Sequence, residues 1–203
     1  LNNKTPLQVA DTPNIDRLAQ MGRCGMFDTI PAGFAPGSEI ANLAVLGYDV
    51  AQVYEGRGTL EAASMGVEIA DNEMAMRCNL ICVKEGVIQS HSAGHISTDE
   101  ARELIAFLQK ELGNDVVSFH PGVSYRHLLK IKNGNKQLNC TPPHDVPGQA
   151  FAPLMIKATE QTAEATANLL NSLIIRSMEI LENHPINLKR AEEGKEKANC
   201  IWP

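Results

Sequence analysis

Ser38 is the residue whose type and position point most directly to chemistry. It follows Pro36-Gly37 and begins a run of residues typical of a helix. One interpretation is a helix N-cap, a position that serine commonly fills. The other is a nucleophile, because the positive end of a helix dipole stabilises an alkoxide and a phosphoryl group attached to it. Since no Gly-x-Ser-x-Gly or Ser-x-x-Lys motif surrounds Ser38, metal activation is the remaining route to a reactive hydroxyl.

Two arginines are candidates for binding an anionic ligand. Arg57 lies between Gly56 and Gly58. Flanking glycines let a ligand approach the backbone, while the guanidinium binds phosphate or carboxylate through two hydrogen bonds. The alternative is an ordinary exposed loop arginine. Arg77 lies in an otherwise apolar run, so it requires a polar partner if it is buried.

Histidines are the other candidates for binding or catalysis. His91 and His95 flank a short turn, and His144 precedes an aspartate in a Pro-rich loop. No pair has the compact spacing of a helical metal site, so each alone is more typical of a structural or surface histidine. A site with two metals needs more protein ligands than this sequence supplies at recognisable spacings.

The composition describes an ordinary globular chain. Of 203 residues, 43% are hydrophobic and 21% charged, which excludes a disordered tail, and the apolar runs are too short for a membrane span. A formal net charge of −6 and 4% aromatic residues argue against a nucleic-acid coat or a base-stacking platform. The five scattered cysteines predict reduced thiols in a cytoplasmic protein.

The elements that would position Ser38 and Arg57 are short helices behind Gly-rich loops. Thr12 and Pro13 predict the start of a helix that ends at Gly22. Two more helices follow the loops, and the free N–H groups at such helix starts favour anions. The expected elements are a strand over 24–30 and helices over 38–46 and 59–65.

The rest of the chain predicts a compact α+β unit. A capping box, Ser97 with Glu100, marks a helix whose apolar residues recur at helical spacing. Residues 189–197 carry charges of both signs and are interpreted as a solvated connector. The other expected elements are strands over 76–83, 86–89, 116–120 and 125–132, and a long helix over about 157–182.

Several segments together resemble a known family. Thr12–Ala19 resembles the opening helix of the alkaline phosphatase superfamily. Pro36–Asp49 is similar to the nucleophile segment of archaeal-type cofactor-independent phosphoglycerate mutases. The pattern continues in the same order in Tyr54–Gly58, Leu60–Ala63 and Arg77–Asn79. The resemblance covers most of the chain and makes Ser38 the expected nucleophile.

The resemblance implies a phosphoglycerate mutase of glycolysis, which interconverts 3- and 2-phosphoglycerate through a phosphoserine. Ser38 would attack this small phosphorylated substrate and return the phosphoryl group to another hydroxyl. Two divalent metal ions (Mn, Mg or Zn in relatives) would hold Ser38 and the phosphate, with most of their ligands outside this chain. The expected substrate-binding residues are Arg57, Arg77, His91, His95, Arg126 and His144.

The resemblance also implies an α/β fold, in which an alkaline phosphatase-like core is interrupted by an inserted α+β substrate domain. Residues 1–73 would belong to the metal-binding core, 74–190 to the inserted domain and 191–203 to a connector back to the core. Family members begin with a strand ending in Asp-Gly and carry most metal ligands after the insert. This sequence has neither, so we expect a fragment that is inactive as an isolated 203-residue chain.

Two departures from the family leave other functions open. Archaeal mutases carry an arginine-rich turn where this chain has His91–His95, and Asn42 replaces a histidine. Fewer arginines weaken the hold on a ligand with both a phosphate and a carboxylate. One alternative is therefore a homoserine kinase analogue of the same family. Another is a non-catalytic binding module in which Ser38 only caps its helix. No nucleic acid or membrane partner is expected, and the oligomeric state is left open.

Overall fold

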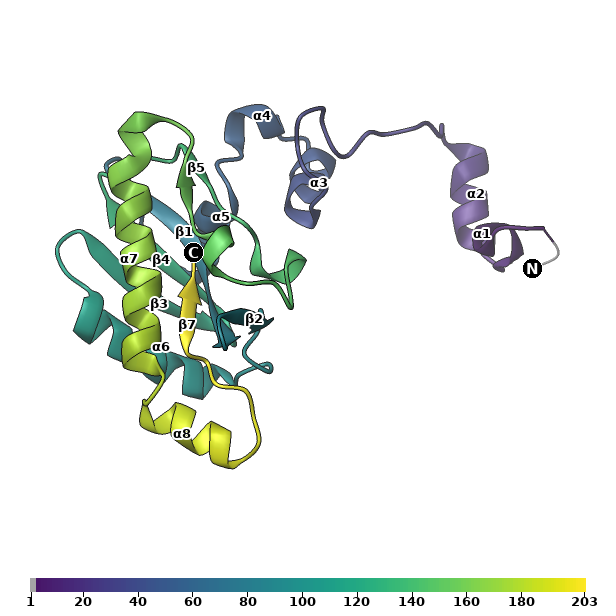
Figure 1. The fold of residues 1–203 in the computed structure, drawn as a ribbon. Coiled ribbons are helices and arrows are strands. Elements are labelled where there is room, and N and C mark those ends of the chain that lie inside the picture. Colours follow the sequence, from purple (N-terminus) through teal and green to yellow (C-terminus); the bar gives the residue numbers. More distant parts are fainter. Residues whose placement is uncertain (1–2) are drawn as a thin grey trace. The chain divides into compact units, whose positions relative to one another are not determined.

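The computed structural model describes residues 3–203, which form two compact units divided between Tyr54 and Glu55 (Figure 1). The first unit consists of helices and loops, and the second combines helices with the strands. The predicted mixed α/β class is therefore confirmed. The finer prediction of a core and an inserted domain, with boundaries near residues 73 and 190, stays a prediction.

Proline and glycine set the limits of a helix in the first unit. α2 (Pro13–Met21) begins at a proline, whose fixed φ suits the first helical position, and its C-cap is Gly22, as predicted. Thr12 is the N-cap residue, but its side chain accepts no capping hydrogen bond, and its hydroxyl donates to Asp16 Oδ1 at 3.2 Å. The other helices of this unit are α1 (Pro6–Val9), α3 (Ser38–Val45) and α4 (Val50–Val53).

Residues 24–30 are irregular, so the prediction of a strand there is wrong. An extended segment becomes a strand only when its N–H and C=O groups pair with a neighbouring strand. Among residues 3–54 there is no other strand with which this segment could pair. A short, partly apolar run therefore carries too little information to predict a strand by itself.

Strand β1 (Glu73–Lys84) is the centre of the main sheet in the second unit. Its partners, all antiparallel, are β2 (Val87–Ser90), β4 (Arg126–Lys132) and β7 (Cys200–Trp202). β3 (Val117–Val123) pairs with β4 on the side away from β1. The four strands predicted between residues 76 and 132 are thus confirmed, and most of their ends differ by one residue from those expected.

Three helices pack against this sheet. α5 (Arg57–Met65) packs against β1, α6 (Thr98–Leu112) against β3 and α7 (Glu164–Leu181) against β7. The predicted capping box at the start of α6 is confirmed. Ser97 Oγ accepts from Glu100 N, and the Glu100 carboxylate accepts from Ser97 N.

α7 begins at Glu164, so the predicted helix start at about residue 157 is wrong. Lys157–Ala158 instead forms strand β6, which pairs with β5 (Leu138–Asn139). The side chain of Asn171 also bonds both the N–H and the C=O of Ile156. Backbone groups engaged in these pairings are not free to make helical hydrogen bonds. Three short 3-10 turns are η1 (Pro143–Asp145), η2 (Ala152–Leu154) and η3 (Gln161–Ala163).

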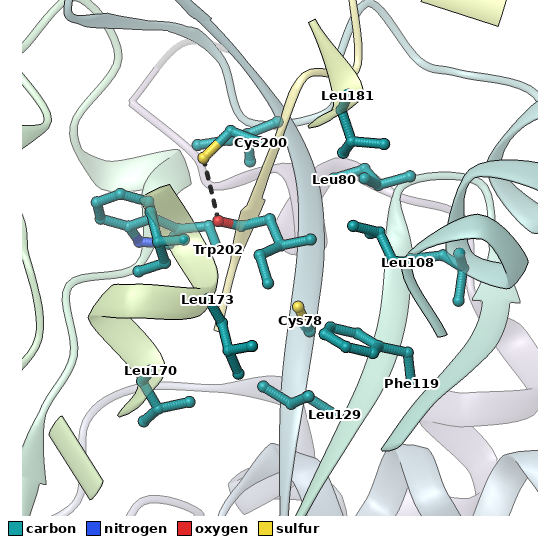
Figure 2. Close-up of a cluster of buried hydrophobic side chains, with 14 of the residues drawn as sticks. Cys78, Leu80, Leu108, Phe119, Leu129, Leu170, Leu173, Leu181, Cys200 and Trp202 are labelled. Atoms are coloured by element: carbon teal, nitrogen blue, oxygen red, sulfur yellow. Dashed lines mark hydrogen bonds between the residues drawn. The ribbon is translucent and has the colours of Figure 1, made fainter. Parts of the chain in front are cut away.

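One hydrophobic core joins the sheet to α6 and α7, and Figure 2 shows its side chains gathered around β1 and β7. Trp202 is buried in this core, and its indole N–H donates to Thr141 O at 2.8 Å. Burial raises the pKa of the Cys78 thiol to about 12 and that of Cys82 to about 11. These thiols are therefore neutral and act as small apolar groups.

The charged segment over 189–197 is only partly the solvated connector that its sequence predicts. Residues 191–196 are exposed, but Arg190 lies in α8 (Pro185–Glu192) and is 2% exposed. Residues 200–202 then form β7, a buried strand. In the part of the chain that the structure describes, no helix combines the length and hydropathy that crossing a membrane requires.

His127 of β4 makes the stability of the fold depend on pH. It is 2% exposed, its Nδ1 accepts from Gly122 N at 3.1 Å, and its Nε2 has no hydrogen-bond partner among the described residues. Burial lowers its pKa from 6.5 to about 3. Between these two values the unfolded state binds a proton that the folded state excludes, so stability is lost as the pH falls.

We expect His127 to contribute a slope of up to about 1.4 kcal/mol per pH unit to the free energy of unfolding in this pH range. His127→Phe keeps a ring and removes the titration, so its slope should be smaller. Its stability near neutral pH should be lower, because Gly122 N–H loses its acceptor. Urea unfolding at several pH values measures both slopes, and equal slopes for the two proteins would contradict the prediction.

Candidate active site

Ser38 is the first residue of α3, and its side chain is exposed. The N-cap position belongs to Gly37, and no side chain among the described residues accepts a capping hydrogen bond there. The interpretation of Ser38 as an N-cap is therefore wrong. Its hydroxyl lies at the positive end of a helix of 8 residues, where the free N–H groups of the first turn favour a negatively charged oxygen.

In the Gly56-Arg57-Gly58 segment, the backbone conformation or packing requires glycine at both glycine positions. Gly56 has a φ of 107° and a ψ of 171°, a region open essentially to glycine alone. Gly58 packs so closely against β1 that a Cβ atom there would lie 2.0 Å from Ala75 O. Arg57 is thus fixed as the first residue of α5, with an exposed side chain.

A pocket of about 320 Å³ lies beside this segment, and both Arg57 and Arg77 line it. Lys136 also lines the pocket and forms an ion pair with Glu55. The acidic residue Glu73 also belongs to the lining, and the apolar part consists of Ile69, Met74, Ala75, Met76, Leu138 and Cys140. The pocket has the size of a site for a small molecule, and it brings together two of the predicted substrate-binding residues.

Arg77 has the polar partners that its place in an apolar strand requires. Its Nε donates to Asn79 Oδ1 at 3.2 Å and lies 3.9 Å from Glu61 Oε1. Burial lowers the pKa of the guanidinium, the nearby Glu61 carboxylate raises it, and Arg57 and Arg126 lower it. Because an arginine in a protein stays protonated, the guanidinium groups of Arg57, Arg77 and Arg126 favour an anion, and the Glu61 carboxylate balances part of their charge.

Three of the other four predicted substrate-binding residues lie around Tyr125, and the fourth, His144, lies beside His91. We call these five residues the Tyr125 cluster: His91, His95, Tyr125, Arg126 and His144. The ring centroids of His91 and His95 lie 5.7 Å and 6.5 Å from that of Tyr125. The His144 ring lies 6.3 Å from His91, and Arg126 Cζ lies 6.0 Å from the centre of the Tyr125 ring. The sequence does not identify Tyr125, because nothing in its spacing distinguishes it from an ordinary strand residue.

The surroundings of His91 favour a neutral ring. Burial lowers its pKa, and the nearby His144, His95 and Arg77 lower it further. A neutral imidazole can both donate and accept a hydrogen bond, so it suits a ligand that carries hydroxyl and anionic oxygens. Arg77 lowers the pKa of His91 and also lines the pocket, so this arginine is near both the pocket and the Tyr125 cluster of the second unit.

The predicted site residues do not all belong to one unit. Ser38 belongs to the first compact unit, whereas the six predicted substrate-binding residues belong to the second. Within residues 3–203, no group of three or more His, Cys, Asp or Glu side chains is arranged to hold a metal ion. The donor set of these residues therefore does not by itself fit the two metal ions that the resemblance implies.

Comparison with known proteins identifies the class of the chain. Residues 19–187 match the family described as 2,3-bisphosphoglycerate-independent phosphoglycerate mutase, and the chain belongs to this family. It is 49% identical over 203 residues to the protein of that name from Methanosarcina barkeri. It is 46% identical over 206 residues to the probable one from Geobacter sulfurreducens. The chain covers 50% of each, so it spans about half the length of the curated relatives it matches.

Two solved structures match almost the whole of this chain. The cofactor-independent phosphoglycerate mutase of Thermoplasma acidophilum matches with a TM-score of 0.65 at 27% identity, over 99% of this chain and 53% of that one. A protein of Pyrococcus horikoshii matches with a TM-score of 0.68 at 28% identity, over 99% of this chain and 45% of that one. The family predicted from the sequence is therefore confirmed.

We expect Gly58→Ala to destabilise the second unit, because the added methyl group would overlap the Ala75 carbonyl. The free energy of unfolding should fall by about 1–3 kcal/mol, the usual cost of overpacking, and urea or thermal unfolding measures it. Gly25→Ala is the matched control, since a Cβ at Gly25 meets nothing within 4 Å. A comparable loss in this control would contradict the steric explanation.

Proposed function

We propose that the protein transfers a phosphoryl group between the 3- and 2-oxygens of phosphoglycerate through a phosphoserine at Ser38. The observation that carries the proposal is the exposed Ser38 hydroxyl at the start of α3, where no side chain of the described residues caps the helix. Membership of the mutase family supports it, as do curated relatives that bear the mutase name and match all of this chain.

The proposed reaction consists of two transfers. Ser38 Oγ loses its proton and attacks the phosphorus of 3-phosphoglycerate, the bond from phosphorus to the 3-oxygen breaks, and that oxygen takes up a proton. The 2-hydroxyl of the bound glycerate then loses a proton and attacks the phosphoserine, which releases Ser38 Oγ to take up a proton again. The positive end of α3 favours both the attacking oxygen and the phosphoserine.

Arg57, Arg77 and the Tyr125 cluster are proposed to hold the glycerate. It must stay bound between the two transfers, because its loss would leave a phosphorylated enzyme and free glycerate. A carboxylate suits the paired N–H groups of a guanidinium, and neutral imidazoles suit the hydroxyl groups. In this proposal residues 1–73 supply the nucleophile, residues 74–190 hold most of the substrate, and 191–203 connect back to the core.

Two divalent metal ions, Mn, Mg or Zn, are proposed as cofactors on the strength of the family resemblance. Ser38 is the ligand expected from this chain. The other His, Cys, Asp and Glu side chains of residues 3–203 form no cluster that would hold a metal ion. The roles of Arg57, Arg77 and the Tyr125 cluster are accordingly derived from their own charges and hydrogen-bonding groups.

A second candidate function is the phosphorylation of homoserine. The observation that favours it is the turn over residues 91–95, which carries His91 and His95 and no arginine. Phosphorus NMR of full-length protein with Mn²⁺ distinguishes the two functions when 3-phosphoglycerate, or homoserine with a phosphoryl donor, is supplied. We expect 2-phosphoglycerate to form from the first mixture. Phosphohomoserine from the second mixture alone would contradict this and favour the kinase analogue.

Ser38 should carry a phosphate after full-length protein is incubated with 3-phosphoglycerate and Mn²⁺, and peptide mass spectrometry locates it. Ser38→Ala should lose this phosphate and lower turnover by roughly a thousandfold or more, because the nucleophile is absent. Ser64→Ala, a change of an exposed serine in α5, should leave both unchanged. Absence of phosphate on Ser38 with every donor would favour the non-catalytic binding module.

A further inference from the structure

The turn over residues 91–95, which carries two histidines of the Tyr125 cluster, has a backbone that needs support from its surroundings. Ala93, Gly94 and His95 have φ values of 46°, 62° and 53°, so three consecutive residues are left-handed. Glycine adopts this conformation freely, but other residues keep it only where the surrounding structure holds them. The contacts around Ala93 and His95 therefore decide where the histidine rings lie.

Serine hydroxyls hold the amide side of this turn. Ser90 Oγ accepts from Ser92 N at 3.4 Å and from Gly94 N at 3.1 Å. Ser92 Oγ accepts from His95 N at 3.4 Å. These bonds all lie within residues 90–95, so they shape the turn without fixing it to the rest of the unit.

Arg190 of α8 holds the carbonyl side of the turn from outside. Its Nη2 donates to Ala93 O at 2.7 Å, its Nη1 to Glu100 Oε2 at 2.9 Å and its Nε to Glu196 O at 2.8 Å. The side chain is 3% exposed, and hydrogen bonds shielded from water are stronger than exposed ones. The guanidinium thus joins the turn, helix α6 and the chain after α8 at one point.

The start of α6 also holds Tyr125. Ser124 Oγ donates to Ile96 O at 2.7 Å, and Ser124 N donates to Thr98 Oγ1 at 3.1 Å. The hairpin that carries Tyr125 is therefore attached to the start of α6, where Glu100 also accepts the hydrogen bond from Arg190. The histidine side and the tyrosine side of the cluster share this anchor.

We propose that Arg190 is a positioning residue for the Tyr125 cluster. It holds His91 and His95 at the separation from Tyr125 that is needed to bind an anionic, hydroxyl-bearing substrate. Arg190 acts through the Ala93 carbonyl and not through the ligand. The positioning itself rests on the contacts of Arg190, and its effect on the substrate rests on the proposed function.

Arg190→Met and Arg190→Lys in full-length protein test this proposal. NMR of the histidine rings over a range of pH measures the His91 pKa, and NMR with increasing 3-phosphoglycerate measures the affinity for this substrate. Without the guanidinium the turn should relax and His91 should move away from His144 and Tyr125. Its pKa should then rise toward the ordinary value, because burial and neighbouring positive groups lower it in the folded protein. Affinity for 3-phosphoglycerate should fall roughly tenfold or more, as expected when binding groups are misplaced. Arg190→Lys keeps the charge and should restore part of both properties.

Lys197→Met is the matched control. Lys197 Nζ also binds a backbone carbonyl and a carboxylate, both of Glu182, and the side chain is 23% exposed. Both methionine variants should lower the thermal unfolding temperature. Only Arg190→Met should change the His91 pKa and the affinity for 3-phosphoglycerate, whereas a purely stabilising role of Arg190 would change neither.

Folded Arg190→Met with an unchanged His91 pKa and unchanged contacts between the His91 and Tyr125 rings would overturn the proposal. If Arg190→Met does not fold, the same two readouts are measured for Arg190→Lys and Glu100→Gln. Glu100→Gln keeps an acceptor for Arg190 Nη1 but removes the negative charge that pairs with it. Unchanged readouts in both folded variants would then overturn the proposal. If the unsubstituted protein binds no 3-phosphoglycerate while Arg190→Met still changes the His91 pKa, the proposed function fails and the positioning role stands.

Discussion

The close approach of α5 to β1 is the constraint on which the candidate site depends. Gly58 leaves no room for a side chain between the α5 backbone and Ala75 O, so Arg57 is held beside the strand that carries Arg77. β1 also pairs with β2, which leads into the turn of the two histidines. On its other side β1 pairs with β4, which follows Tyr125 in the chain. The arrangement of the substrate-binding residues therefore follows from one central strand and its neighbours.

Local signals predict this fold well where a few neighbouring residues decide the backbone. The capping box of Ser97 and the helix between Pro13 and Gly22 are confirmed because each signal acts within one helical turn. The strand over 24–30 and the helix start at residue 157 are wrong because they depend on pairing. Whether a segment is extended depends on whether a distant segment is present to pair with it, as β5 is for β6.

The net charge of −6 gives no indication of the charge at the site. Arg57 and Arg126 each lie near enough to Arg77 to lower its pKa. The sequence identifies Arg57 by its flanking glycines and Arg77 by its apolar neighbours, since both patterns constrain the backbone or burial locally. It does not identify Tyr125, because the two histidine rings around Tyr125 come from the turn over residues 91–95, which is distant from it in the sequence.

Arg77 and Arg190 show how one type of side chain serves two purposes. Arg190 uses Nε, Nη1 and Nη2 for acceptors of the protein itself. Arg77 makes a hydrogen bond from Nε, and within residues 3–203 its two Nη groups have no hydrogen-bond partner, so they can serve an anion. The run of charges around Arg190 is typical of a solvated segment and predicts that Arg190 is exposed, whereas its side chain is buried. Two of its acceptors lie on residues 90 and 97 positions earlier in the chain, and no local pattern contains that information.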